Sequence, residues 1–256
     1  MSVVVPLALV LPGAEPAALA SGPTLMRRQL AVACRVLSLN GHDDFNQGQV
    51  SARAKGAAEF HIKNAVRGFD DAGPEDMVLC PVRADMRVPR DAPPETPLHQ
   101  AIYAVRPDVG AVIHSHAEHA TVFGATDLEL EPISHEGSYF KDRIARFDET
   151  SHTILEHEVA GAVARALGKH CALLLCNHGL VVVGPTLRQA VVMACMLERA
   201  CRLQLLAQSI RRDYRVTRDD EVQKKREYIY SDVAFRNYWN HAAQAAARSF
   251  PELRAW

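Results

Sequence analysis

The stretch Val109–His116 (VGAVIHSH) places a short apolar run directly before two histidines. A second apolar run, Cys171–Cys176 (CALLLC), is followed by an asparagine and then by His178. Apolar runs of this length, bounded by turn residues, are typical of strands that are buried on both faces. We therefore predict two buried strands whose ends carry His114, His116 and His178.

Helical and β-type patterns surround these two runs in an order that favours an α/β fold. The predicted strands are Gln49–Arg53, Glu59–Lys63, Met77–Cys80, Val109–His114, Cys171–Cys176 and Leu180–Val183. The predicted helices are Thr24–Asn40, Pro97–Val105, Ala117–Ala125, Ser151–Gly168 with Ser151 as its N-cap, and Thr186–Ser209. The alternation predicts a layered α/β/α architecture. We expect one domain over residues 1–256, with an N-terminal arm at 1–22 and a C-terminal helical tail at 211–256.

The composition excludes several classes of protein. The chain has 256 residues with 29 Lys+Arg and 30 Asp+Glu, a formal net charge of −1, which disfavours nucleic acid as a partner. No apolar run approaches the roughly 20 residues that cross a bilayer, so no membrane partner is expected. The start lacks the basic region of a signal peptide. The six cysteines form no CxxC pair, which favours reduced thiols in a cytoplasmic protein.

The three strand-end histidines predict a metal site. Residues i and i+2 of a strand point to the same side, so His114 and His116 can converge on one point. Catalytic zinc usually takes three protein ligands and keeps one open position, and His178 is the natural third donor. Taken singly, each histidine is more often an ordinary strand-end residue, and only their convergence favours the metal.

Glu95 precedes the predicted helix Pro97–Val105, and two interpretations of it remain open. A carboxylate at this position complements the helix dipole. Alternatively, it acts as a general acid or base beside the metal.

Three motifs occur in a fixed order: Glu95–His99 (ETPLH), Ile102–Phe123 (IYAVRPDVGAVIHSHAEHATVF) and Cys176–Gly184 (CNHGLVVVG). Together they resemble the class II aldolase/adducin family, which includes fuculose- and ribulose-phosphate aldolases, from about Leu30 to about Leu206. The resemblance implies a three-layer α/β/α fold with a central mixed, largely antiparallel sheet. It also implies a homotetramer with active sites between neighbouring subunits.

The resemblance further assigns roles to the residues of the metal site. It implies one divalent ion per subunit, Zn²⁺ or Mn²⁺ with Fe²⁺ as a third option, held by His114, His116 and His178. It implies Glu95 as the catalytic acid or base.

Departures from the family pattern concern the substrate. The family's sugar-phosphate aldolases hold phosphate with a Gly-Asn pair, a Thr/Ser-Gly loop and a Ser-Ser pair before the catalytic glutamate. The corresponding stretches here are Gly48–Ser51 (GQVS), Lys63–Val66 (KNAV) and Pro93-Pro94. Two prolines donate neither a hydroxyl nor an N–H group, and a phosphate needs several donors. We therefore expect a substrate without a phosphate.

The pattern is similar to the decarboxylase branch of the family. We expect a metal-dependent lyase that decarboxylates a hydroxylated aromatic or heteroaromatic carboxylate through a metal-stabilised carbanion. The tyrosine that donates a proton in the aldolases is missing near Ser134–Gly137. The residues expected to contact the carboxylate substrate are Gln49, Arg53, Lys63, Asn64, His135 and Glu136.

Three alternatives remain open. The first is an aldolase for a non-phosphorylated sugar or hydroxy-keto acid. The second is a non-haem iron oxygenase acting on an aryl 2-oxo acid, because histidines with open positions also suit Fe²⁺. The third is a non-enzymatic module like the adducin head.

Overall fold

A computed structural model describes residues 23–210 and 213–256, so the predicted N-terminal arm lies outside the described residues. The strands are β1 (Gln49–Ala52), β2 (Glu59–Lys63), β3 (Met77–Pro81), β4 (Ala111–Ser115), β5 (Ile144–Phe147), β6 (Ala172–Leu175) and β7 (Gly179–Gly184). The helices are α1 (Pro23–Ser38), α2 (Thr96–Val105), α3 (Glu118–Gly124), α4 (His135–Phe140), α5 (His157–Leu167), α6 (Leu187–Ile210), α7 (Asp219–Ile229) and α8 (Asp232–Ser249).

The strands form one sheet in the order β3-β2-β1-β4-β7-β6-β5. Neighbouring strands pair antiparallel, except that β5 and β6 are parallel. The prediction of a mixed, largely antiparallel sheet is therefore confirmed. The two runs predicted to carry the histidines are β4 and β6, and β7 lies between them in the sheet. His178 lies in the turn that joins β6 to β7, and β7 pairs directly with β4, which fixes this turn relative to the end of β4.

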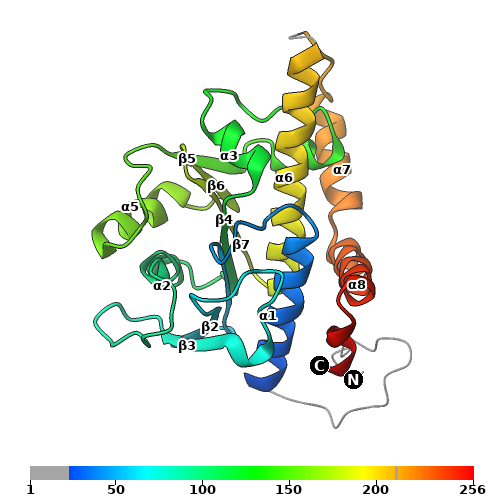
Figure 1. Cartoon of the computed structure of the whole chain (residues 1–256). Coiled ribbons are helices and arrows are strands. Elements are labelled where there is room, and N and C mark those ends of the chain that lie inside the picture. Colours follow the sequence, from blue (N-terminus) through cyan, green and yellow to red (C-terminus); the bar gives the residue numbers. More distant parts are fainter. Residues whose placement is uncertain (1–22, 211–212) are drawn as a thin grey trace, which may run out of the picture.

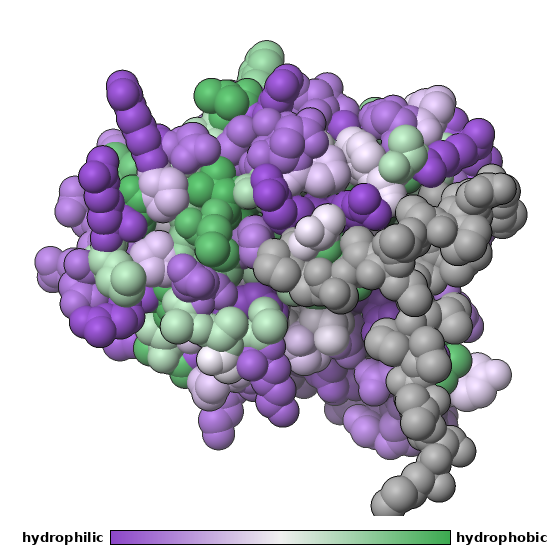
Figure 2. All heavy atoms as spheres, turned by 90° about the horizontal axis from the view of Figure 1, so that it is seen from below, coloured by the Kyte–Doolittle hydropathy of each residue, from purple (hydrophilic) through white to green (hydrophobic). Residues whose placement is uncertain are grey.

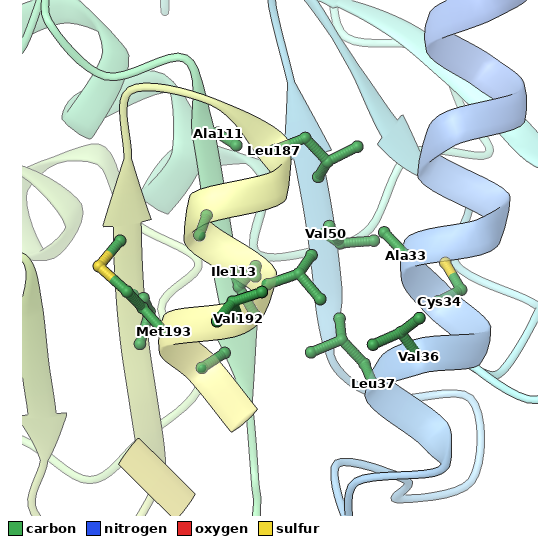
Figure 3. Close-up of a cluster of buried hydrophobic side chains, with 14 of the residues drawn as sticks. Ala33, Cys34, Val36, Leu37, Val50, Ala111, Ile113, Leu187, Val192 and Met193 are labelled. Atoms are coloured by element: carbon green, nitrogen blue, oxygen red, sulfur yellow. The ribbon is translucent and has the colours of Figure 1, made fainter. Parts of the chain in front are cut away.

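Helices cover both faces of the sheet, which confirms the three-layer prediction (Figure 1). Along β4, Ile113 joins the core under α1, α6 and α8, whereas Val112 joins the core under α2 and α5. Strand side chains alternate between faces, so a central strand needs apolar residues at both parities. Figure 3 shows the first of these cores, where side chains of α1 and α6 meet those of β1 and β4.

On the face that Figure 2 presents, hydrophilic side chains cover most of the coloured surface, and a smaller hydrophobic patch lies among them. Among the described residues, no helix combines the length and apolar character needed to span a bilayer.

Three elements differ from the sequence-based expectation. The helix predicted from Ser151 begins at His157, with Glu156 as its N-cap. The residues before it are not helical, because Ile154 is buried and its N–H group bonds a distant carboxylate. Two further elements, α4 and β5, were not predicted. Both are short, and tertiary contacts decide the conformation of such segments more than local pattern does.

Candidate metal centre

Strand pairing brings the three predicted histidines together where the end of β4 lies beside the start of β7, in the middle of the sheet. In the register of β4 with β7, His114 lies opposite Val181 and Ser115 lies opposite Leu180. The end of β4 therefore lies beside the start of β7, which His178 immediately precedes. The turn before β7 contains Asn177 at a φ of 57°, a left-handed conformation that asparagine tolerates better than most residues.

The fourth member of the group is Glu95, the N-cap residue of α2. It is buried, and α2 packs on the face of the sheet from which His114 projects. Its carboxylate lies 3.1 Å from His114 Nε2 and 3.6 Å from His178 Nε2. One donor atom from each of Glu95, His114, His116 and His178 lies within 4.8 Å of the other three. The structure thus brings together all four residues that the sequence singled out.

Hydrogen bonds orient two of the imidazole rings. His114 Nδ1 lies 2.9 Å from the carbonyl oxygen of Leu180, which can only accept, so Nδ1 carries the proton. His116 Nδ1 lies 2.7 Å from the Asp44 carboxylate. The Nε2 atom of each ring is left as an available lone pair, and this is the arrangement of histidines that bind metal.

The same ring atoms test whether a metal fits. Three buried atoms, His114 Nε2, His116 Nε2 and His178 Nδ1, have no hydrogen-bond partner among the described residues. Buried polar atoms without partners are costly, so several in one place indicate a missing ligand. Three imidazoles and a carboxylate are donors that suit Zn²⁺, Mn²⁺ or Fe²⁺. The residues present therefore fit a divalent ion.

The members of the cluster differ in the direction and the cause of their pKa shifts. Burial alone would raise the pKa of Glu95, but the close contact with His114 and the charge of that ring when protonated outweigh burial and hold the pKa below its usual range. Glu95 also accepts hydrogen bonds from the Ile154 N–H group at 2.9 Å and from Gln49 Nε2 at 3.2 Å. Burial, followed by the charge of His114, lowers the pKa of His178 to about 4. At neutral pH Glu95 is therefore a carboxylate and His178 is neutral, and both are protonation states that bind metal. Burial alone would lower the pKa of His114, but its contact with Glu95 outweighs burial and raises that pKa.

Two supporting residues escaped the sequence analysis. Asp44 lies in the loop between α1 and β1 and orients His116. In the same loop, His42 is fully buried, and its Nδ1 lies 2.7 Å from the hydroxyl of Ser115, the residue between His114 and His116. Neither residue lies near the others in sequence, so no local motif marks them. Only the rule that metal-bound histidines need an outer partner points to such a residue.

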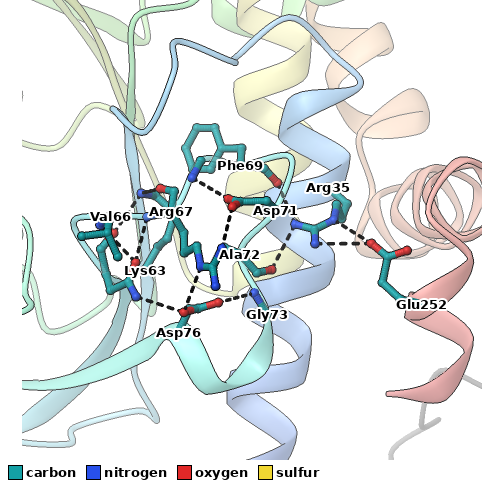
Figure 4. A network of polar contacts seen from close by, with 12 residues as sticks. Arg35, Lys63, Val66, Arg67, Phe69, Asp71, Ala72, Gly73, Asp76 and Glu252 are labelled. Atoms are coloured by element: carbon teal, nitrogen blue, oxygen red, sulfur yellow. Dashed lines mark hydrogen bonds and ion pairs between the residues drawn. The ribbon is translucent and has the colours of Figure 1, made fainter.

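Lys63 and Asn64 were predicted to contact substrate, and in the structure both form hydrogen bonds with their own loop. Figure 4 shows Lys63 in this network. The Lys63 ammonium donates to the carbonyl oxygens of Asn46, Asn64 and Arg67. The Asn64 side chain donates to Asp76 and accepts from the next turn of backbone. Burial lowers the pKa of Lys63. Their predicted contact with substrate stays a prediction.

Gln49 is the first residue of β1, and Arg53 directly follows its last residue, Ala52. Gln49 pairs with His114 across the sheet, so it joins the metal cluster through Glu95, and its Oε1 atom has no partner among the described residues. Arg53 lies at the other end, where it donates to the carbonyl oxygens of Val109 and Arg106. The structure does not bring Arg53 to the cluster.

Between Gln49 and Arg53, Ser51 of β1 forms a buried polar seam with His99 and Tyr103 of α2. The Ser51 hydroxyl lies 2.7 Å from His99 Nδ1 and 2.9 Å from the Tyr103 hydroxyl. Glu95, His99 and Tyr103 are four residues apart and so share one face of α2. This seam fixes α2, and with it Glu95, against β1.

The last two predicted contacts, His135 and Glu136, belong to α4. The Glu136 carboxylate accepts a hydrogen bond from Arg199 of α6 at 2.9 Å. Both residues line a cavity beside α6 that none of the four cluster residues lines. Within one chain they are therefore not part of the metal centre.

Comparisons with known proteins agree with this fold. The solved structure of an aldolase II superfamily protein from Pseudomonas syringae has a TM-score of 0.81, with 24% sequence identity, over 93% of this chain and 98% of that chain. At this identity the likeness shows the fold alone.

Two curated relatives from Streptomyces share part of the sequence. The "Decarboxylase NovR" of Streptomyces niveus is 37% identical over 110 residues, 43% of this chain and 41% of that protein. The "4-hydroxy-3-prenylphenylpyruvate oxygenase/4-hydroxy-3-prenylbenzoate synthase" of Streptomyces roseochromogenus subsp. oscitans is 37% identical over 110 residues, 43% of this chain and 40% of that protein. In these matches the chain spans about two fifths of each relative's length.

The family itself is shown by a longer match. The sequence profile described as "Class II Aldolase and Adducin N-terminal domain" matches residues 28–205, which is more than half of the chain and includes the whole candidate metal centre. This membership, with the decarboxylase name of one relative, agrees with the expected lyase. The chain therefore belongs to the class II aldolase and adducin family.

Proposed function

We propose that this protein is a divalent-metal-dependent carbon–carbon lyase that decarboxylates a hydroxylated aromatic or heteroaromatic carboxylate without a phosphate group. The observation that carries the proposal is the convergence of His114, His116, His178 and Glu95, with three ring nitrogens left unpartnered. The partial match to a protein named as a decarboxylase supports the choice of reaction.

The three histidines would hold the ion, with Asp44 and the Leu180 carbonyl keeping two rings in place. A divalent ion in this position supplies Lewis-acid chemistry to adjacent oxygens of a substrate. One ion per subunit is proposed, with Zn²⁺ or Mn²⁺ as the first candidates because three imidazoles suit both.

Glu95 is proposed to move the proton. Glu95 is a carboxylate at neutral pH, so it begins in the form that accepts the proton of a substrate hydroxyl. Cleavage of the carbon–carboxylate bond releases CO₂ and leaves an electron pair on the ring carbon. Glu95 then returns its proton to that carbon, so the proton count balances and no oxidant is needed.

The absence of a phosphate from the substrate is supported by the loops around the site. Pro93 and Pro94 supply no donor before Glu95. The Lys63 ammonium has three N–H donors, and three backbone carbonyls accept from it. The Lys63 ammonium therefore has no N–H donor left for a phosphate at this loop.

Several features complete the proposal. Gln49, whose Oε1 atom has no partner among the described residues, is the proposed polar contact of the substrate beside Glu95. We further propose a cytoplasmic homotetramer with sites between neighbouring subunits. The six cysteines, all unpaired, suit a reducing compartment.

The test is a decarboxylation screen with metal control. Purified protein is stripped with dipicolinate, reloaded with Zn²⁺, Mn²⁺, Co²⁺ or Fe²⁺, and incubated with hydroxybenzoates and hydroxypyridine carboxylates. We expect CO₂ release by the reloaded protein and none by the stripped protein. In D₂O, we expect deuterium on the ring carbon that lost the carboxylate. Equal activity after verified metal removal would sink the proposal. Aldehyde release from hydroxy-keto acids, without CO₂, would instead identify the aldolase alternative.

A second candidate is a non-haem iron oxygenase acting on an aryl 2-oxo acid. It is favoured by the relative whose name includes an oxygenase and by the suitability of the histidines for Fe²⁺. Oxygen uptake that depends on Fe²⁺ and on an aryl pyruvate distinguishes it, since the decarboxylation proposed above proceeds equally without oxygen.

A further inference from the structure

A second concave site lies on the other side of the sheet from α2. A cavity of about 620 Å³ is bordered by the C-terminal end of α1, by α6 and by residues of α3, α4 and α8. Cavities of this size hold small organic molecules. Since none of the four metal-cluster residues lines it, this cavity is distinct from the metal centre within the chain.

The lining combines an apolar wall with aromatic rings. Val36 of α1 and Val192 and Met196 of α6 line the cavity with apolar side chains and belong to the same hydrophobic core. Tyr230 and Tyr238 also line it, from the end of α7 and from α8. Such a lining favours the apolar body of a ligand over a hydrated inorganic ion.

The charged groups of the lining leave positive charge available. Glu198 is buried, and its two oxygens accept from the His119 ring, the His119 N–H group and the Ala120 N–H group. Glu136 is paired with Arg199. Among the described residues, Arg202 makes no ion pair, although it lies one helical turn from Arg199 at the cavity. The carboxylates are thus occupied and one guanidinium is free for an anion.

The same cavity is joined to the metal centre by a short segment of chain. Asn40 and Gly41 line the cavity. The next residues reach the metal centre, because His42 contacts Ser115 and Asp44 orients His116. Gly41 has a φ of 81°, and the next N–H group, that of His42, bonds the Leu37 carbonyl oxygen at 3.2 Å, so α1 ends between these two contacts. A ligand against Asn40 and Gly41 would therefore contact the same segment that carries Asp44.

We propose that this cavity binds a small organic anion with an apolar body, and that its occupancy changes the metal affinity of the centre through the segment from Asn40 to Asp44. Arg202 is the anion contact, and the wall of Val192 and Met196 receives the apolar body. The proposal concerns binding and does not depend on which reaction the metal centre performs.

The first experiment measures anion binding with 8-anilinonaphthalene-1-sulfonate as the probe. We expect saturable fluorescence, displacement by benzoate, and little displacement by benzyl alcohol or acetate, because charge and apolar body are both needed. Arg202→Met should weaken the probe about 5- to 10-fold, the loss of one charge-assisted contact. The matched control is Arg165→Met, an exposed arginine on α5 outside the cavity, which should bind the probe like the unaltered protein.

Two outcomes of this experiment would overturn the proposal. One is equal probe affinity in Arg202→Met and in the unaltered protein. The other is weakened probe affinity together with a changed sedimentation coefficient in Arg202→Met, which would make the cavity a contact between copies of the chain.

The second experiment measures coupling. The dissociation constant of the probe is determined with and without saturating Zn²⁺, and that of Zn²⁺ with and without the probe. We expect both constants to change by the same factor, about 3- to 10-fold, because coupling between two sites is reciprocal. Identical probe affinity with and without Zn²⁺ would contradict the proposed link to the metal centre.

Discussion

Two buried glutamates, Glu95 and Glu198, contact histidines in this molecule. The two contacts differ in whether the polar atoms around them all have hydrogen-bond partners. Glu95 faces His114 and His178 at the strand ends, where three ring nitrogens lack partners. Glu198 of α6 faces His119 at 2.6 Å, and its oxygens also accept two backbone N–H groups at the start of α3. The first pair belongs to a convergent group of donors, whereas the second pair is closed by its own hydrogen bonds.

This difference teaches how to separate a metal site from a structural contact. Residue type alone does not, because both contacts are between a glutamate and a histidine. Unpartnered buried nitrogens mark the first site, since burying them without a ligand costs about 1–3 kcal/mol each. In the second site the carboxylate holds the N-terminal end of a helix, where backbone N–H groups need acceptors. The predictions below test this distinction.

The largest expected effect is on metal binding. His178→Ala removes one of three imidazole ligands, and we expect metal affinity to fall by about 1000-fold or more, with activity lost in proportion. His178 is partly exposed, so its removal leaves the apolar core intact. Metal content after dialysis, measured by mass spectrometry, checks this.

His119→Ala is the matched control, because it also removes an imidazole that contacts a buried glutamate. We expect it to retain one metal ion per chain. Loss of metal in His119→Ala, or full metal content in His178→Ala, would show that the two contacts do not differ in the way described.

A smaller effect is expected at Asp44. Asp44→Asn keeps the size of the side chain but removes the carboxylate that accepts from His116 Nδ1. Outer partners of this kind typically contribute 10- to 100-fold to metal affinity, so we expect a loss of that order in a competition titration with a chelator. An unchanged affinity would mean that Asp44 does not orient His116.

At Glu198 the expected effect is on stability. Glu198→Gln retains one acceptor oxygen but loses part of the contact with His119 and α3, so the free energy of unfolding should fall by about 1–3 kcal/mol. Metal content should stay at one ion per chain. Urea denaturation of the metal-free protein measures the first quantity, and a metal-depleted variant would be the unexpected result.

Much of the fold and the metal cluster could be predicted because their signals are local. The apolar run before His114 shows a central strand, and the spacing of His114 and His116 shows a shared side. The resemblance of the motif around Glu95 supplied the fourth member. Asp44 could not be predicted, because its contact spans 72 residues of sequence with no pattern to mark it.

The residues predicted to contact substrate illustrate a second limit of prediction from sequence, which concerns the partners of charged side chains. Arg53 and Lys63 carry the charge expected for an anion, but the fold turns their donors toward backbone carbonyls. The sequence shows which residues carry charge. It does not show which backbone carbonyls will lie within reach of them, since that depends on loops that meet only in the folded chain.

The smallest expected effect sharpens the comparison with a histidine that contacts neither glutamate directly. His99 is fully buried and bonded to Ser51, and burial lowers its pKa from 6.5 to about 3. Above pH 6.5 this histidine is neutral in both the folded and the unfolded chain, so its contribution to stability is fully present. As the pH falls below 6.5, only the unfolded chain takes up the proton, and stability is lost until the pH approaches the folded pKa. By pH 5.5 the loss is about 1 kcal/mol, since one pKa unit corresponds to 1.36 kcal/mol.

His99→Gln keeps a polar group for Ser51 but does not titrate. Urea denaturation of the metal-free proteins at pH 7.5 and pH 5.5 should therefore show a pH-dependent loss that is smaller in His99→Gln by about that amount. An equal loss in both proteins would mean that His99 is protonated in the folded chain and that burial alone does not keep a histidine of this seam neutral.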